Sequence, residues 1–172
     1  LLFSGNMDYP PNIHAALWFY RKVFPKLIEE FPKIRFCLAG RNPSRKFDFL
    51  KMDKRIIISG FVSDIRPWFD RASLYVCPMI SGTGVKTKVL EAMAMEKGIV
   101  ATSLSLDGIP GALPFVFCAD APEAFAKLVI RALRDPVLRE RLGKTGREFV
   151  LKHHKWRHSA ERLERIFYEI SG

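Results

Sequence analysis

Two lysines and a glutamate follow a pair of glycines in the segment SGTGVKTKVLE, residues 81–91. The pattern predicts that a helix begins near Lys86, which puts both lysines at its N-terminus. The unpaired N–H groups and partial positive charge of that end disfavour a lysine unless an anion lies close by. Glycines let backbone N–H groups approach a phosphate closely. The segment therefore predicts a diphosphate site formed by Gly82, Thr83, Gly84, Lys86 and Lys88.

Glu91 lies three residues after Lys88, one turn into the same predicted helix. An ionised carboxylate can accept two hydrogen bonds from the hydroxyls of a ribose. The same spacing also suits a surface ion pair with Lys88, worth only about 0.3–0.5 kcal/mol. From these residues alone both interpretations stay open.

Two established nucleotide motifs do not fit this segment. A Walker loop places lysine directly after glycine, whereas Val85 separates Gly84 from Lys86. The dinucleotide fingerprint needs a third glycine at the position of Thr87. A different phosphate-binding loop is expected.

Short apolar runs alternate with helical patterns along the first two thirds of the chain. The runs predict strands at Leu1–Ser4, Ile34–Ala39, Ile56–Ser59, Leu74–Cys77, Ile99–Thr102 and Phe115–Cys118. Helices are expected at Ile13–Phe31, with a kink or break at Pro25, and at Asp64–Ala72, Lys86–Met95, Glu123–Arg134, Val137–His153 and Trp156–Ser171. This alternation predicts an α/β fold: a Rossmann-like parallel sheet with helices on both faces, whose ligands bind beyond the carboxyl ends of the strands.

The 172 residues suit a single domain, 1–172, in which residues 123–172 are mainly helical. A hydrophobic content of 48% and a charged content of 27% are typical of a globular protein. No apolar run is long enough to span a membrane. Because the chain opens at Leu1, directly in a predicted strand, we expect it to be part of a longer protein.

The net charge of +10 admits several kinds of partner. Many basic residues gather near the end of the chain: Arg131, Arg134, Arg139, Arg141, Lys144, Arg147, Lys152, Lys155, Arg157, Arg162 and Arg165. Their helical spacing favours a solvated helix face, with a surface facing a membrane or an acceptor as the alternative. No nucleic-acid partner is expected, because no DNA- or RNA-binding motif accompanies the charge.

The histidines and cysteines give weaker signals. His154 and His158 have the spacing of a zinc pair, but no third ligand is evident, so a polar helix surface is expected. His14 is either a surface or capping residue or a contact to the ligand. The three cysteines, which lie in apolar runs, are expected to be reduced thiols of a cytoplasmic protein.

The longer segment SGTGVKTKVLEAMAMEKGIVAT resembles the signature of nucleotide-sugar-dependent glycosyltransferases of family 4, also called group 1. Three further segments resemble the same family in order: FSGNMDYPPN, LAGRNPS and SGFVSDIRPWF, followed by Trp156 and a closing helix. These enzymes have the two-domain GT-B fold. The resemblance implies that the chain is the C-terminal, donor-binding half and that the N-terminal acceptor domain is absent from it.

Carried onto this sequence, the resemblance assigns Glu91 to the donor ribose and Gly82–Gly84, Lys86 and Lys88 to the diphosphate. It places the backbone near Phe61 and Val62 close to the base, and Arg41 in the base or phosphate pocket. Two departures stand out. Many members have a glutamate at the position of Thr83, which puts the usual contact to the donor sugar in doubt. Glycine and proline often follow the helix where this chain has Glu96 and Gly98.

The resemblance implies transfer of a sugar from a UDP- or GDP-sugar to an acceptor that it does not identify, with retention of configuration and without a cofactor or metal. Catalytic residues stay unassigned, and this chain alone is expected to bind donor without transferring the sugar. The implied location is the cytoplasm, with peripheral contact to the inner face of the membrane as an option. A non-catalytic nucleotide-sugar-binding or partner module of the same fold is the alternative, and a basic domain that docks on anionic membranes or nucleic acid is a third.

Overall fold

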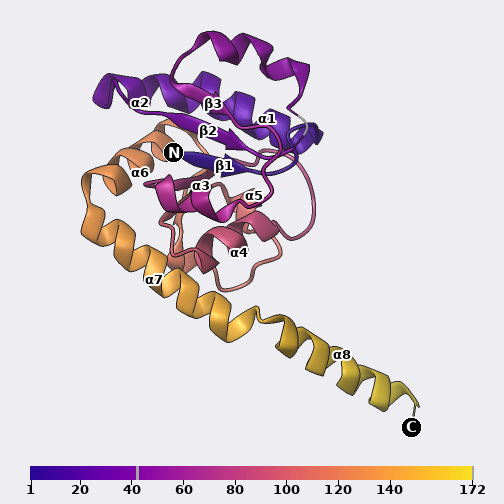
Figure 1. Ribbon diagram of the computed structural model, residues 1–172. Helices are drawn as coiled ribbons and strands as arrows, with labels where there is room; N and C mark the ends of the chain where they lie inside the picture. Colours follow the sequence, from indigo (N-terminus) through magenta and orange to yellow (C-terminus); the bar gives the residue numbers. More distant parts are fainter. Residues whose placement is uncertain (42, 172) are drawn as a thin grey trace.

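The computed structural model describes residues 1–41 and 43–171, without the side chains of residues 156, 158, 159, 162 and 171. Within this part of the chain, six parallel strands form one sheet in the order β3-β2-β1-β4-β5-β6. Figure 1 shows β3, β2 and β1 side by side. The strands are β1 (Leu2–Ser4), β2 (Phe36–Ala39), β3 (Ile56–Ile58), β4 (Tyr75–Cys77), β5 (Ile99–Ala101) and β6 (Phe117–Cys118). The predicted parallel α/β sheet is confirmed, and every strand ends within two residues of its predicted bounds.

The strand order reverses between β1 and β4, at the centre of the sheet. These two strands share one register pair, Leu2 with Tyr75, whereas β1 and β2 share three. Beyond that pair the Tyr75 hydroxyl takes the place of a backbone partner: it accepts from the Ser4 N–H at 3.4 Å and lies 2.9 Å from Ser4 Oγ. In an open α/β sheet such a switch point opens a crevice at the carboxyl ends of the strands.

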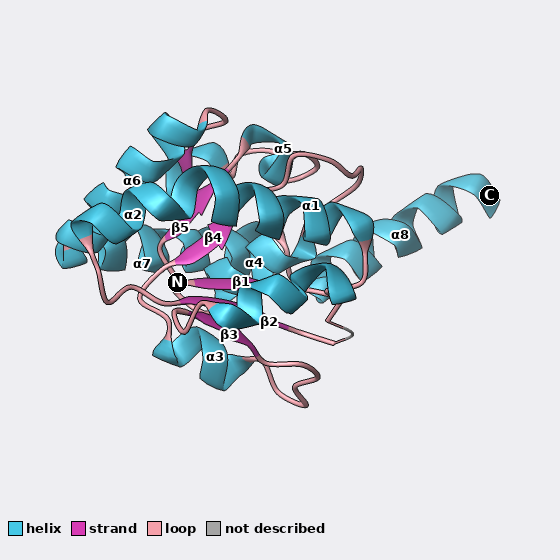
Figure 2. Cartoon of the chain, turned by 90° about the horizontal axis from the view of Figure 1, so that it is seen from above, coloured by secondary structure: helices cyan, strands magenta, loops and turns pink. Residues whose placement is uncertain are grey.

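Helices cover both faces of the sheet (Figure 2). The α-helices of the described part are α1 (Pro10–Trp18), α2 (Phe24–Glu30), α3 (Arg66–Arg71), α4 (Thr87–Ala94), α5 (Ser103–Leu106), α6 (Pro122–Arg134), α7 (Pro136–His153) and α8 (Trp156–Ser171), of which α8 lies away from the sheet. α2 packs against α6, and α4 packs against α7. Within the described ranges, no helix is both long and apolar enough to cross a membrane. The predicted helices are thus present, with shifted ends.

The long helix predicted for Ile13–Phe31 is interrupted just before Pro25. A π-helical segment, Phe19–Val23, separates α1 from α2. Proline lacks an N–H group, and its ring crowds the carbonyl four residues earlier, so a wider turn relieves the conflict. The segment also carries Phe19 into the core, where its ring centroid lies 4.6 Å from that of Phe36 and 5.9 Å from that of Phe125. Phe19, in the segment just before the predicted break at Pro25, therefore packs against both β2 and α6.

A 3₁₀ helix at Arg45–Met52 was not predicted from the sequence. The Ser44 hydroxyl accepts from the Lys46 N–H at 3.3 Å and caps its start. Phe47 and Leu50, three residues apart, are buried on the same side. That spacing matches the three residues per turn of a 3₁₀ helix, which a search for the 3.6-residue period passes over.

Near the C-terminus, α8 projects away from the body of the molecule in both views. His154 lies between α7 and α8, and its ring packs 5.3 Å from that of Phe149. The side chain of His158, the other member of the predicted pair, is outside the described part of the chain, as is that of Trp156. Cys37 and Cys77 are buried, Cys118 is half-buried, and all three are free thiols. Burial raises the pKa of Cys37 to about 11.

Candidate functional site

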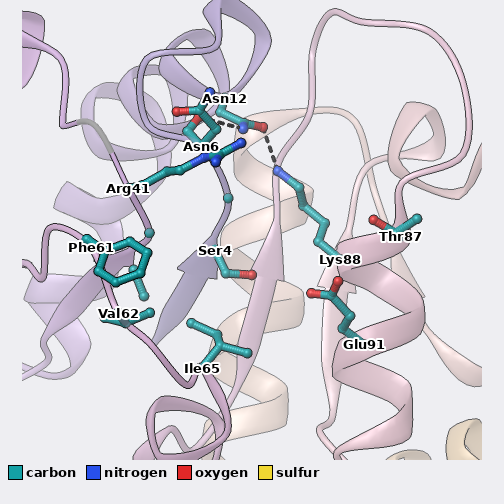
Figure 3. A pocket seen from close by; sticks show the side chains of 13 residues that line it. Ser4, Asn6, Asn12, Arg41, Phe61, Val62, Ile65, Thr87, Lys88 and Glu91 are labelled. Atoms are coloured by element: carbon teal, nitrogen blue, oxygen red, sulfur yellow. Dashed lines mark hydrogen bonds between the residues drawn. The ribbon is translucent and has the colours of Figure 1, made fainter.

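A cavity of about 370 Å³ lies at the carboxyl ends of the strands, at the switch point between β1 and β4. Its lining comes from the segments that follow β1, β2 and β3 and from the first turns of α4: Ser4, Gly5, Asn6, Asn12, Ala39, Gly40, Arg41, Phe61, Val62, Ile65, Thr87, Lys88 and Glu91. Figure 3 shows these side chains converging from both sides of the reversal. The cavity therefore occupies the place where a sheet of this order binds its ligands.

Backbone hydrogen bonds fix one wall of the cavity. The Gly5 N–H donates to the Ala39 carbonyl at 3.0 Å, and the Gly40 N–H donates to Ser59 Oγ at 3.2 Å. Gly40 has a φ of +144°, and a Cβ at this position would lie 1.8 Å from the Gly5 carbonyl oxygen. Only glycine allows the segments after β1 and β2 to approach so closely. The wall is therefore set before any ligand arrives.

Lys88 reaches into the cavity from the second residue of α4. Its ammonium donates to Asn12 Oδ1 at 2.5 Å and lies 4.6 Å from the centroid of the Phe3 ring. Burial lowers the pKa of Lys88 below its usual 10.5; Cys77 and Glu91 oppose this shift, and Lys86 adds to it. A cation is thus held at the cavity, near helix N–H groups that also favour an anion.

Glu91 lines the same cavity one turn further along α4. Its side chain is exposed and, among the described residues, forms no hydrogen bond or ion pair. In Figure 3 its carboxylate points into the space between α4 and the segment after β3. The alternative interpretation, a surface ion pair between Lys88 and Glu91, is not what the structure contains. Both side chains face the cavity instead.

The opposite side of the cavity carries the other three residues expected there. Arg41 and Val62 line it, and Phe61 lies at its edge with 75% of its surface exposed. Figure 3 shows the Arg41 side chain extending toward Asn6, while Phe61 and Val62 lie across the cavity from Lys88 and Glu91. An exposed aromatic ring beside a cavity offers a flat apolar surface to a planar group.

The glycine-bearing loop before α4 lies outside the lining of this cavity. Gly82 and Gly84 have φ values of +99° and +77°, as their glycine identity suggests, and Thr83 is exposed. Lys86 is buried and turns back into its own loop, where its ammonium donates to the Gly84 carbonyl at 2.6 Å. The structure thus brings Lys88 and Glu91 to the cavity and places Gly82, Thr83, Gly84 and Lys86 beside it.

The loop rests against the start of α1. A Cβ at Gly82 would lie 3.0 Å from Pro11 Cβ, and His14 Nδ1 lies 3.3 Å from Ser81 Oγ. His14 is exposed on this side of the molecule. It therefore contacts the loop rather than the cavity.

Asn12 is one of several cavity residues, with Ser4 and Asn6, that were not predicted from the sequence. It lies 76 positions before Lys88 and is only 4% exposed. The rule that ligands bind beyond the carboxyl ends of parallel strands could have indicated residues such as Ser4 and Asn6 after β1. Nothing in the local sequence indicates that Asn12 reaches the helix after β4.

Comparisons with known proteins agree with this architecture. The family model of the glycosyl transferases group 1 matches residues 1–135. An uncharacterized 44.6 kDa protein in the cps region of Klebsiella pneumoniae is 31% identical over 116 residues, which cover 63% of this chain and 30% of that protein. A phosphatidyl-myo-inositol mannosyltransferase of Mycobacterium tuberculosis is 26% identical over 190 residues, which cover 100% of this chain and 47% of that protein. The chain spans less than half the length of both relatives.

Two solved structures share the fold. The C-terminal domain of LpcC, a glycosyl transferase group 1 family protein from Francisella tularensis, has a TM-score of 0.71 at 20% identity, over 90% of this chain and 85% of that one. A TarM mutant from S. aureus, in complex with fondaparinux, alpha-GlcNAc-glycerol and UDP, has a TM-score of 0.80 at 14% identity, over 96% of this chain and 34% of that one. Since the family model covers more than half of the sequence, the chain belongs to the glycosyl transferases group 1 family.

Proposed function

We propose that this chain is the donor-binding half of a retaining glycosyltransferase that uses a UDP- or GDP-sugar. The observation that carries the proposal is the cavity at the switch point, which gathers a cation, a carboxylate that has no ion-pair partner among the described residues, and an exposed aromatic ring. Those three groups match the diphosphate, ribose and base of one nucleotide.

In the proposed complex, Lys88 and the N–H groups at the start of α4 face the diphosphate. Glu91 accepts hydrogen bonds from the ribose hydroxyls, and Phe61 and Val62 lie at the base, with Arg41 on the base or phosphate side. The glycine loop, residues 82–84, and Lys86 complete the diphosphate site from beside the cavity, which requires Lys86 to leave the Gly84 carbonyl.

During transfer, the bond between the anomeric carbon of the sugar and the diphosphate oxygen breaks, and the nucleophilic atom of the acceptor forms the new bond to that carbon and gives up its proton. The leaving diphosphate keeps the electron pair, so negative charge grows on its oxygens. Lys88 and the helix N–H groups would stabilise that charge, which is why the proposal includes no metal. The acceptor and the groups that set retention are assigned to a half of the protein outside this chain, so this chain alone should not transfer sugar.

Two of the similar proteins support the proposal. The relative from Mycobacterium tuberculosis is a mannosyltransferase, and the similar TarM structure contains UDP. Neither identifies the sugar or the acceptor of this chain.

Calorimetric titration with UDP, GDP and ADP at two salt concentrations tests the proposal. We expect saturable binding that prefers one base. Lys88→Met should lower the affinity for that nucleotide by about tenfold or more. Lys127→Met, an exposed lysine on α6, is the matched control and should bind like the wild type. The proposal fails if no diphosphate binds, or if binding ignores the base and disappears with salt, as expected for docking on anionic surfaces.

The alternative is a non-catalytic module that binds a nucleotide sugar or a partner. The presence of Thr83, where many members have a glutamate, favours it. This alternative predicts nucleotide binding by the chain, but no transfer when the complete protein is supplied with donor and acceptor. A turnover assay on the complete protein separates the two.

A further inference from the structure

Lys88 is an ammonium held by a neutral partner. Within the described ranges no carboxylate lies within ion-pairing distance of it, and its side chain donates to the amide oxygen of Asn12. A partly buried cation usually has an anionic partner, because leaving water is costly. The positive charge is therefore oriented here without being neutralised.

The amide of Asn12 can adopt only one orientation. Its Nδ2 donates to the Asn6 carbonyl at 2.8 Å, and its Oδ1 accepts from Lys88 at 2.5 Å. A carbonyl can only accept and an ammonium can only donate, so the two neighbours fix which end of the amide faces each. Asn12 itself is held by α1 and is almost completely buried. The segment after β1 thus sets the position of a lysine on α4.

Gly5 leaves the space that this contact needs. A Cβ at Gly5 would lie 2.7 Å from Asn12 Nδ2 and 2.8 Å from Lys88 Nζ. The ring of Phe3 lies under the ammonium at 4.6 Å from its centroid, which adds a second uncharged attraction. Asn12 on α1 and Phe3 on β1 therefore both contact the ammonium, and Gly5 leaves the space for it.

We propose that Asn12 is a positioning residue that holds the Lys88 ammonium at the cavity without cancelling its charge, so that a diphosphate meets an oriented cation. The inference rests on the proposed function for its ligand, but not for the contact itself. An aspartate at this position would still accept from Lys88, but it would lose the hydrogen bond to the Asn6 carbonyl and neutralise the charge that an anion needs. A purely structural buried asparagine would show no such dependence on charge.

The first measurement needs no ligand. NMR titration of the Lys88 ε-carbon, assigned from the signal missing in Lys88→Met, gives the pKa of the ammonium in the free protein. The groups acting on it are Cys77 on β4, Glu91 on α4 and Lys86 before α4. We expect Asn12→Ala to lower the pKa of Lys88, because an acceptor of the charged form is lost, and Asn12→Asp to raise it. An unchanged pKa in both variants overturns the inference, whatever the protein binds.

The second measurement compares UDP with uridine, or GDP with guanosine if the wild type prefers guanine. Asn12→Ala should lower the affinity for the diphosphate by about tenfold and the affinity for the nucleoside by less than about twofold. Asn12→Asp should also weaken the diphosphate, although Lys88 stays in place. In a Lys88→Met background, adding Asn12→Ala should not change the affinity for either ligand further. Equal losses for diphosphate and nucleoside would mean that Asn12 only supports the fold and would overturn the proposal.

The two measurements separate this inference from the proposed function. A wild type that binds no nucleotide removes the proposed function, while the NMR titration still decides the role of Asn12. A wild type that binds, with variants that bind equally well, removes the inference alone. If Asn12→Ala does not fold, the nearly isosteric Asn12→Asp carries both measurements.

Discussion

Glu91 projects into the cavity and has no hydrogen-bond partner among the described residues, so its proposed role can be tested with little risk to the fold. We expect Glu91→Gln to weaken UDP or GDP binding by about tenfold, because a charge-assisted hydrogen bond is stronger than a neutral one. The 2′,3′-dideoxy form of the same nucleotide should bind the wild type and the variant equally. Calorimetry on both ligands checks this.

Glu148 is an exposed residue of α7, so Glu148→Gln is the matched control and should bind the nucleotide with the affinity of the wild type. If Glu91→Gln weakens the dideoxy nucleotide as strongly as the ordinary one, the carboxylate acts on something other than the ribose hydroxyls. The ribose assignment would then be wrong.

At the residue scale, the sequence predicted the positions of the α4 residues better than those of the glycine loop before α4. Lys88 and Glu91 share a regular helix, so their spacing alone predicted that they would lie on adjacent turns. Lys86 precedes the first helical turn, and its conformation depends on the carbonyl of Gly84, which no periodicity predicts. Asn12 was missed because its contact joins segments that are distant in the chain.

At the scale of elements, the C-terminus of α4 explains why glycine is common there in the family. Glu96 has a φ of +53°, in the left-handed region. The Glu96 N–H donates to the Met93 carbonyl at 2.9 Å, and the Lys97 N–H donates to the Ala92 carbonyl at 3.0 Å. This pair of bonds is the Schellman motif, whose left-handed position favours glycine. The helix ends correctly with a residue that is strained there.

We therefore predict that Glu96→Gly stabilises the protein by about 1 kcal/mol and raises its melting temperature by roughly 2–4 °C. The lost contact with Arg147, at 3.6 Å and half-exposed, offsets little of this gain. Glu96→Ala, which removes the same contact but keeps the strain, should not stabilise. Thermal unfolding followed by circular dichroism distinguishes them; equal melting temperatures for the two variants would contradict the argument.

The turn after α4 also shows why helix ends were predicted less well than helices. Gly98 and Gly143 allow α7 to approach: a Cβ at Gly143 would lie 2.0 Å from the Glu96 carbonyl oxygen, and one at Gly98 would lie 2.6 Å from Arg139 Cγ. Apolar periodicity predicted both helices, because it reports burial of one face. The two glycines are needed because α7 packs closely against the turn after α4. That tertiary contact cannot be predicted from apolar periodicity.

For the molecule as a whole, the basic residues near the C-terminus are partly used inside the fold. Arg134 pairs with Glu30, Arg139 donates to the Ala132 carbonyl at 2.9 Å, and Arg147 donates to the Ala94 carbonyl at 2.9 Å. These contacts favour the solvated helix face over a surface reserved for an anionic partner.

α8 contributes little to the core, because its described large apolar side chains are between 42% and 77% exposed: Leu163, Ile166, Phe167, Tyr168 and Ile170. We predict that removing residues 156–172 changes the unfolding free energy by less than about 1 kcal/mol and leaves nucleotide affinity unchanged. Denaturant unfolding and calorimetry of the shortened protein test this. A large loss of stability would mean that α8 packs on the body of the molecule in solution.

The single register pair between β1 and β4 makes the centre of the sheet its most sparsely bonded line. The cavity lies over the junction of β1 and β4, with the segments after β1, β2 and β3 on one side and α4 on the other. A molecule that occupied the cavity would therefore act as a cross-link between two halves of one sheet. A bound ligand would therefore make the sheet stiffer, without moving any helix or strand.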